Sequence, residues 1–128
     1  MTPEELDRIS NEVIGAAIEV HRILGPGLLE SAYEQSMAWE LGLRNLRLRR
    51  QVQIPVLYKG LRIEEGYRVD MIVNDGVILE LKCVGALEPI HTAQVLTYLK
   101  MTGLKLGMLL NFRVDAMRHG IKRIVNNF

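Results

Sequence analysis

The stretch that decides the fold is VILELKCV at residues 77–84, an apolar strand pattern interrupted by two charged residues, Glu80 and Lys82. Residues two apart on a strand share one face of the sheet. Ionised Glu and Lys side chains in apolar surroundings are costly unless they are paired or bind a metal. Their presence has two explanations: a salt bridge at the rim of the sheet, or a functional site.

A second carboxylate, Asp70, precedes this strand in the apolar run YRVDMIV at residues 67–73, and the turn NDG at residues 74–76 separates the two strands. A three-residue loop with Gly76 in the left-handed conformation would place Asp70 opposite Glu80 on one face. A two-residue Asp-Gly loop would place the two carboxylates on opposite faces. The functional reading requires the three-residue loop, because two opposed carboxylates then favour a cation between them.

The segments before these strands have helical patterns. Thr2, Pro3 and Glu5 form a cap signature that predicts the start of a helix, which ends at Gly25-Pro26-Gly27. A second helix is expected from about residue 28 to residue 41, with its end at Gly42. The residues expected to face inward on this second helix are Leu29, Ala32, Ser36 and Trp39.

The remaining elements follow from periodicity and turn residues. Alternation over residues 51–58 predicts a strand in which Pro55 requires an edge position or a bulge, and Lys59-Gly60 predicts the next turn. The later elements expected are a helix at 89–102, a strand covered on both faces at 106–112, a helical turn at 115–119 and a short strand at 121–125. This order predicts an α/β fold, a mixed sheet with helices packed on it.

Length and composition indicate one soluble domain over residues 1–128, of which 48% are hydrophobic. The lone Cys83 cannot form an internal disulfide, which fits a cytoplasmic location. No apolar run approaches the roughly 18 residues of a membrane span, so no membrane partner is expected. The 16 basic and 15 acidic residues give a net charge of +1. This balance argues against a polybasic nucleic-acid coat, so any nucleic-acid contact requires a local patch.

The one dense basic run is RNLRLRR at residues 44–50. It is interpreted either as a solvated connection before an edge strand or as a patch in which Arg47, Arg49 and Arg50 contact phosphates. A homodimer that pools two such patches is a further hypothesis.

The charged residues of the sheet form the pattern D-x9-E-x-K, made by Asp70, Glu80 and Lys82. The helix expected after them carries Gln94 and Tyr98 four residues apart and hence on one helical face. The order of these residues is more specific than any one of the motifs alone.

The segment GLLESAY at residues 27–33 completes a resemblance that covers nearly the whole chain. The sequence resembles the GxxExxY proteins of the PD-(D/E)XK nuclease superfamily. One departure is Val69, which stands where the superfamily name has Pro. The resemblance implies a restriction-endonuclease-like core of order αβββαβ with an extra N-terminal helix.

The resemblance also implies an activity, that of a metal-dependent endonuclease hydrolysing phosphodiester bonds in nucleic acid, with DNA as the expected substrate and Mg²⁺ or Mn²⁺ as cofactor. The catalytic residues it implies are Asp70, Glu80, Lys82, Gln94 and Glu30. Asp70, Glu80 and Glu30 would ligate the metal. Lys82 would orient the attacking water or offset negative charge, and Gln94 would hold the water or a phosphate. The supporting residues would be Tyr33 and Tyr98.

Alternatives remain at this point. A Glu30 just inside a helix start is favourable to the helix dipole without any catalytic role. Glu34, on the same side of that helix, is interpreted as solvated or supporting. The protein could instead be a non-catalytic nucleic-acid or protein binding module with the nuclease fold, or a structural domain in which Glu80 and Lys82 simply pair.

Overall fold

The computed structural model describes residues 1–128, and its elements follow the predicted order. They are α1 (Pro3–Leu24), α2 (Glu30–Leu43), β1 (Leu48–Tyr58), β2 (Leu61–Val73), β3 (Val77–Lys82), α3 (Pro89–Thr102), β4 (Leu106–Asn111), the 3₁₀ helix η1 (Met117–Gly120) and β5 (Ile121–Val125). The predicted last strand is present, and the helical turn expected at 115–119 begins two residues later as η1.

The five strands form one sheet in the order β1-β2-β3-β4-β5. The central strands β3 and β4 run parallel, and every other neighbouring pair is antiparallel. A parallel pair needs a long crossover connection, and α3 provides it. The predicted α/β fold with a mixed sheet is confirmed.

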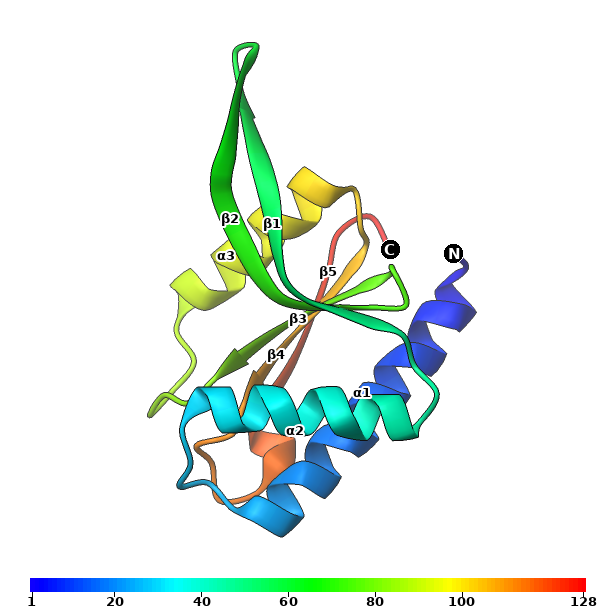
Figure 1. Ribbon diagram of the computed structural model, residues 1–128, viewed down its shortest axis with the longest axis vertical. Helices are drawn as coiled ribbons and strands as arrows, with labels where there is room; N and C mark the ends of the chain where they lie inside the picture. The colour runs from blue at the N-terminus through cyan, green and yellow to red at the C-terminus, as the bar shows by residue number, and fades with distance from the viewer.

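Helices cover both faces of the sheet (Figure 1). On one face α1 and α2 enclose a core of 20 buried residues, to which β3 contributes Val77, Leu79 and Leu81. On the other face α3 encloses a smaller core of 9 buried residues, which includes Ile78. Strand β3 is therefore covered on both sides, which explains why its apolar residues face in both directions.

Helix α1 begins at the predicted cap. The Thr2 hydroxyl accepts from the Glu5 N–H at 3.1 Å, and a Glu5 carboxylate oxygen accepts from the Thr2 N–H at 3.0 Å. The helix ends at Gly25, whose φ of 73° is readily adopted only by glycine.

No helix of the chain combines the length and the apolar character that crossing a membrane requires.

Helix α2 differs from the second predicted helix in its bounds and in the face that it turns toward the sheet. It begins at Glu30 and passes through Gly42 to Leu43. The expected inward residues Leu29 and Trp39 are 78% and 74% exposed, and Ala32 and Ser36 are only partly buried. The inward residues are instead Tyr33, Met37 and Leu41.

The rotation of α2 has a physical cause in Tyr33. Its ring is fully buried and stacks on Phe112 with the ring centroids 4.4 Å apart. Its hydroxyl accepts from the Leu28 N–H at 3.1 Å and donates to the Gly25 carbonyl. This stack and these hydrogen bonds fix which side of the helix faces the sheet.

Strands β1 and β2 form a ribbon whose tip projects beyond the rest of the sheet (Figure 1). Their register shifts between Ile54 and Val56, so Pro55 lies at a bulge in an edge strand, as predicted. Lys59 and Gly60, with φ values of 47° and 87°, form the predicted turn at the tip. The most exposed apolar side chains of the tip are Leu57, Tyr58 and Leu61.

The segment after β3 is anchored by the side chain of Asn111, and Gly120 packs closely against the backbone of Asn111. A Cβ added to Gly120 would lie 2.0 Å from the Asn111 carbonyl oxygen. The Asn111 side chain accepts from the Val84 N–H at 3.1 Å and donates to the Val84 carbonyl at 2.9 Å. The close approach at Gly120 thus positions the residue that anchors the chain beyond β3.

We expect Gly120→Ala to lower the free energy of unfolding by about 2 kcal/mol or more, because the methyl group would overlap a backbone oxygen that cannot move freely. Urea denaturation measures this change. The matched control is Gly85→Ala, since a Cβ at Gly85 meets no atom within 4 Å. Similar losses in the two variants would contradict the explanation.

Candidate active site

The hairpin register brings the two strand carboxylates together. Val73 pairs with Val77, so the loop between β2 and β3 is the three-residue loop at 74–76. Continuing this register places Asp70 opposite Glu80. The alternative with the carboxylates on opposite faces is excluded.

The loop itself corrects one expectation. The left-handed residues are Asn74 and Asp75, with φ values of 49° and 53°, rather than Gly76. Asn and Asp tolerate this conformation well. Gly76 instead packs against the N-terminal residues: a Cβ there would lie 2.7 Å from the Met1 sulfur and 3.4 Å from a Leu6 methyl carbon, so the flexible Met1 side chain would have to move.

Each of the two carboxylates binds the backbone near the other. The Asp70 N–H donates to Glu80 Oε1 at 2.9 Å, and the Leu81 N–H donates to Asp70 Oδ2 at 2.8 Å. The backbone pairing of β2 with β3 ends at Met71 and Leu79, so these side chains continue it. One oxygen of each carboxylate is thereby fixed, and the other has no backbone partner.

Burial and mutual repulsion make the pair unusually basic. Glu80 is only 6% exposed. Burial, followed by the charge of Asp70, raises the pKa of Glu80 to about 8. Burial likewise raises the pKa of Asp70, while the Leu81 N–H lowers it. The site therefore favours a bound proton or cation.

Glu30 and Lys82 complete an electrostatic cluster with this pair. Glu30 is the first residue of α2, and burial, then the charge of Asp70, raise its pKa, whereas Lys82 lowers it. Lys82 is half-buried, and no ion pair joins it to Glu80 or to any other acid. The simple salt bridge considered for Glu80 and Lys82 is therefore wrong.

Helix α3 contributes Tyr98 to this cluster. Tyr98 is 8% exposed and packs edge-on against Tyr67, with ring centroids 5.1 Å apart. Burial, followed by the charges of Glu80 and Asp70, raises the pKa of Tyr98 to about 12. Its hydroxyl is thus a neutral group close to both carboxylates.

Two predicted residues lie differently. The Gln94 side chain is exposed and makes no hydrogen bond within the protein. The inward face of α3 is formed instead by Val95, Tyr98 and Leu99. Tyr33 is in the core, and none of its hydrogen bonds reaches the cluster. It holds the loop that leads into Glu30.

The three arginines predicted to contact phosphates form ion pairs with two acidic residues of the protein. Arg47 and Arg49 form ion pairs with Asp75 at 3.8 and 3.3 Å, beside the turn between β2 and β3. Arg50 pairs with Glu34 at 2.8 Å. Only Arg50 is thus linked to a residue that influences Asp70, since the charge of Glu34 raises the pKa of Asp70.

Glu34, interpreted from the sequence as solvated or supporting, lies beside the cluster, and so does Gln51, which the sequence pattern does not single out. Glu34 Oε2 accepts from Arg50, and Glu34 Oε1 accepts from the Gln51 side-chain amide. Hydrogen bonding from Gln51 also lowers the pKa of Asp70. The four-residue spacing from Glu30 to Glu34 was a visible signal. The position of Gln51 had no such signal.

These residues fit a hard divalent cation. No group of three or more His, Cys, Asp and Glu side chains is arranged to hold a metal ion. Mg²⁺, however, is commonly bound by one or two carboxylates, with water and substrate phosphate as its other ligands. Asp70 and Glu80 provide two adjacent carboxylates, each with an oxygen that has no backbone partner, and a cation would relieve their repulsion.

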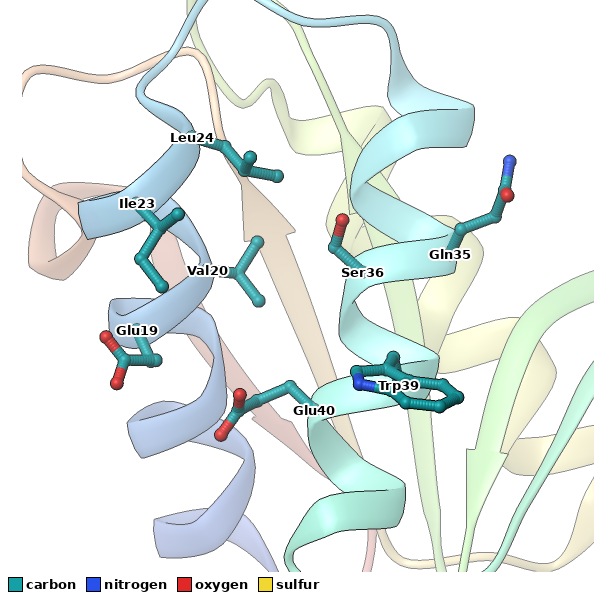
Figure 2. A pocket seen from close by; sticks show the side chains of 8 residues that line it. All are labelled: Glu19, Val20, Ile23, Leu24, Gln35, Ser36, Trp39 and Glu40. Carbon is teal, nitrogen blue, oxygen red and sulfur yellow. The ribbon is translucent and has the colours of Figure 1, made fainter.

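A separate groove lies between α1 and α2 (Figure 2). It has a volume of about 340 Å³, and its apolar lining is formed by Val20, Ile23, Leu24 and Trp39. It shares no residue with the acidic cluster. The apolar groove and the polar site are thus distinct features of the surface.

Comparisons with known proteins agree with this fold. The family model of the PD-(D/E)XK nuclease superfamily matches residues 7–124. The solved structure titled "Crystal structure of SSO0001" is similar, with a TM-score of 0.58 and 18% sequence identity over 77% of this chain. The match spans half of the SSO0001 chain. No curated protein matches the sequence.

The raised pKa of Glu80 predicts a pH dependence of stability. Between its ordinary pKa of 4.5 and the folded value of about 8, the folded protein retains a proton that the unfolded chain has lost. Stability should therefore fall as pH rises through this window, by roughly 5 kcal/mol, and level off above it. We expect Glu80→Gln to remove most of this fall and to be more stable than the parent at pH 8.

Urea denaturation across this pH range, with a chelator present, measures the effect. Glu65→Gln is the control, because Glu65 is an exposed carboxylate outside the cluster. It should leave the slope of stability against pH unchanged. Parallel slopes for the parent and Glu80→Gln would refute the assignment.

Proposed function

This chain belongs to the PD-(D/E)XK nuclease superfamily, and from that premise we propose that it is a metal-dependent nuclease that hydrolyses phosphodiester bonds in nucleic acid, with DNA as its substrate. The observation that carries the proposal is the pair of carboxylates formed by the partly buried Asp70 and the buried Glu80, which are joined by reciprocal hydrogen bonds across one hairpin beside Lys82. A fold alone would not support an activity, whereas this arrangement of charges supports one.

The proposed metal ligands are Asp70 and Glu80, with Glu30 completing or supporting the site. When bound, Mg²⁺ or Mn²⁺ would activate a water and stabilise the charge of the phosphodiester transition state. Asp70 and Glu80 are oriented for this by the backbone N–H groups that each accepts. The mutual repulsion of these acids, felt by Glu30 as well, favours cation binding.

The other roles belong to groups around the pair. Lys82, which has no acidic partner, is available to orient the attacking water or to offset negative charge on the phosphate. Gln94 is exposed on α3 and free of protein hydrogen bonds, so it is available to hold a water or a phosphate. Tyr98 would support the carboxylates directly, and Tyr33 indirectly, through the loop before Glu30.

The finer assignments extend this proposal. We assign the chain to the GxxExxY proteins on the motif at residues 27–33, and we treat residues 1–128 as one domain of a cytoplasmic protein. Arg47, Arg49 and Arg50 are proposed to contact phosphates, exchanging their present acidic partners for substrate. A homodimer would pool two such patches, and sedimentation at micromolar concentration tests it.

A non-catalytic binding module is the second candidate. It is favoured by the absence of a ready-made group of three metal-binding side chains. Such a module would keep the fold and the charges without turnover. The two candidates differ in whether any nucleic acid is cut.

We expect Asp70→Asn to lose Mn²⁺ binding and to slow cleavage by at least about 100-fold, because it removes a charged ligand. Lys82→Ala should slow cleavage to a similar degree while retaining Mn²⁺ binding. Calorimetric titration measures binding, and single-stranded, duplex and branched DNA together with RNA serve as cleavage substrates.

The controls are Glu65→Gln, an exposed acid on the same strand β2, and Lys100→Ala, an exposed lysine on α3. Both should bind Mn²⁺ and cleave as the parent does. Parental cleavage rates in both Asp70→Asn and Lys82→Ala would refute the proposed site. Binding of Mn²⁺ that depends on Asp70, without cleavage of any substrate, would favour the binding module.

A further inference from the structure

Gln51 has an unusual backbone conformation in the middle of β1. Its φ is 51°, although it is neither a glycine nor part of a turn between strands. This left-handed conformation is unfavourable for most residues with a side chain. It persists only where the surrounding structure determines it.

The strand register shows what this conformation faces. Arg50 pairs with Met71 and Val52 pairs with Val69. The partners between them, Gln51 and Asp70, are missing from the regular pairing. The irregularity in β1 therefore lies directly opposite the carboxylate at the centre of the candidate site.

The side-chain amide of Gln51 lies beside two acids. It donates to Glu34 Oε1, and its proximity also lowers the pKa of the Asp70 carboxyl group. An amide nitrogen carries two N–H groups, so it can serve both acceptors. The other oxygen of Glu34 is held by Arg50 through its Nη2 at 2.8 Å and its Nε at 3.2 Å.

We infer that Gln51 is a positioning residue, whose left-handed backbone holds its amide between Asp70 and Glu34 and so joins the Asp70 carboxylate to helix α2. Through Glu34 this connection also fixes Arg50 beside the site. The inference rests on the proposed metal-dependent function, and it adds the residue that sets the orientation of the first ligand. The substitution Gln51→Gly makes both changes at once: glycine relieves the backbone, which the thermal midpoint reports, and removes the amide, which the position of Asp70 reports.

The direct readout is hydrogen exchange at Leu81, measured residue by residue. The Leu81 N–H donates to Asp70 Oδ2 at 2.8 Å, so its protection reports the position of this carboxylate without any metal. In Gln51→Gly we expect its protection to fall by about tenfold, while the thermal midpoint stays equal to that of the parent or rises. The Mn²⁺ dissociation constant should increase by about tenfold, the usual effect of removing a group that orients a metal ligand.

Lys59→Gly is the matched control. Lys59 has nearly the same backbone conformation, with a φ of 47°, but lies at the exposed tip of the ribbon. Glycine there should keep or raise the thermal midpoint and change neither Leu81 protection nor Mn²⁺ affinity. A change of Leu81 protection in Lys59→Gly would overturn the inference.

The remaining outcomes separate the inference from the proposed function. Unchanged Leu81 protection in Gln51→Gly would overturn the positioning role, whatever the metal does. A lower thermal midpoint with uniform loss of protection across the sheet would also overturn it, because Gln51 would then be merely structural. Lost protection confined to the hairpin, in a parent that binds no Mn²⁺, would sustain the positioning role and refute the metal site.

Discussion

Asp70 and Glu80 oppose each other across the β2–β3 hairpin, and each carboxylate accepts a backbone N–H near the other residue. Repulsion between a buried and a partly buried acid works against folding, while these hydrogen bonds keep both side chains in place. The hairpin register, the cover of α3 over one face and the start of α2 at the strand end all converge on this pair. A folded domain has little reason to retain such a conflict unless a cation resolves it.

Each of the two cores positions different residues of this site. In the larger core, the stack of Tyr33 on Phe112 sets the rotation of α2. That rotation in turn determines where Glu30, the first residue of α2, is placed. The smaller core buries Tyr98 under the sheet face that carries Glu80. The site therefore lies where helices from both layers reach the end of β3, and neither layer alone assembles it.

Much of this fold could be predicted from local sequence signals, whereas features that depend on packing between distant residues could not. Cap, turn and alternation signals are short-range, so the first helix, the crossover helix and the order of elements along the chain follow from the sequence. The hairpin register does not, because the turn residues at 74–76 are compatible with both a two-residue and a three-residue loop. The rotation of α2 does not follow, because Trp39 and Met37 are both apolar and only contact with the sheet distinguishes them. The left-handed Gln51 likewise results from its neighbours across space, and the residue type gives no signal of it.

The projecting ribbon of β1 and β2 contacts little beyond itself near its tip, where Leu57, Tyr58 and Leu61 remain exposed (Figure 1). A two-stranded hairpin without a third strand or a covering helix is only marginally stable. Its outer half can therefore separate and re-form while the sheet below the Pro55 bulge remains paired. The outer ribbon is thus expected to unfold and refold locally, independently of the rest of the sheet. Pulling on the ribbon or cleaving its tip would then leave Asp70 and Glu80 in place.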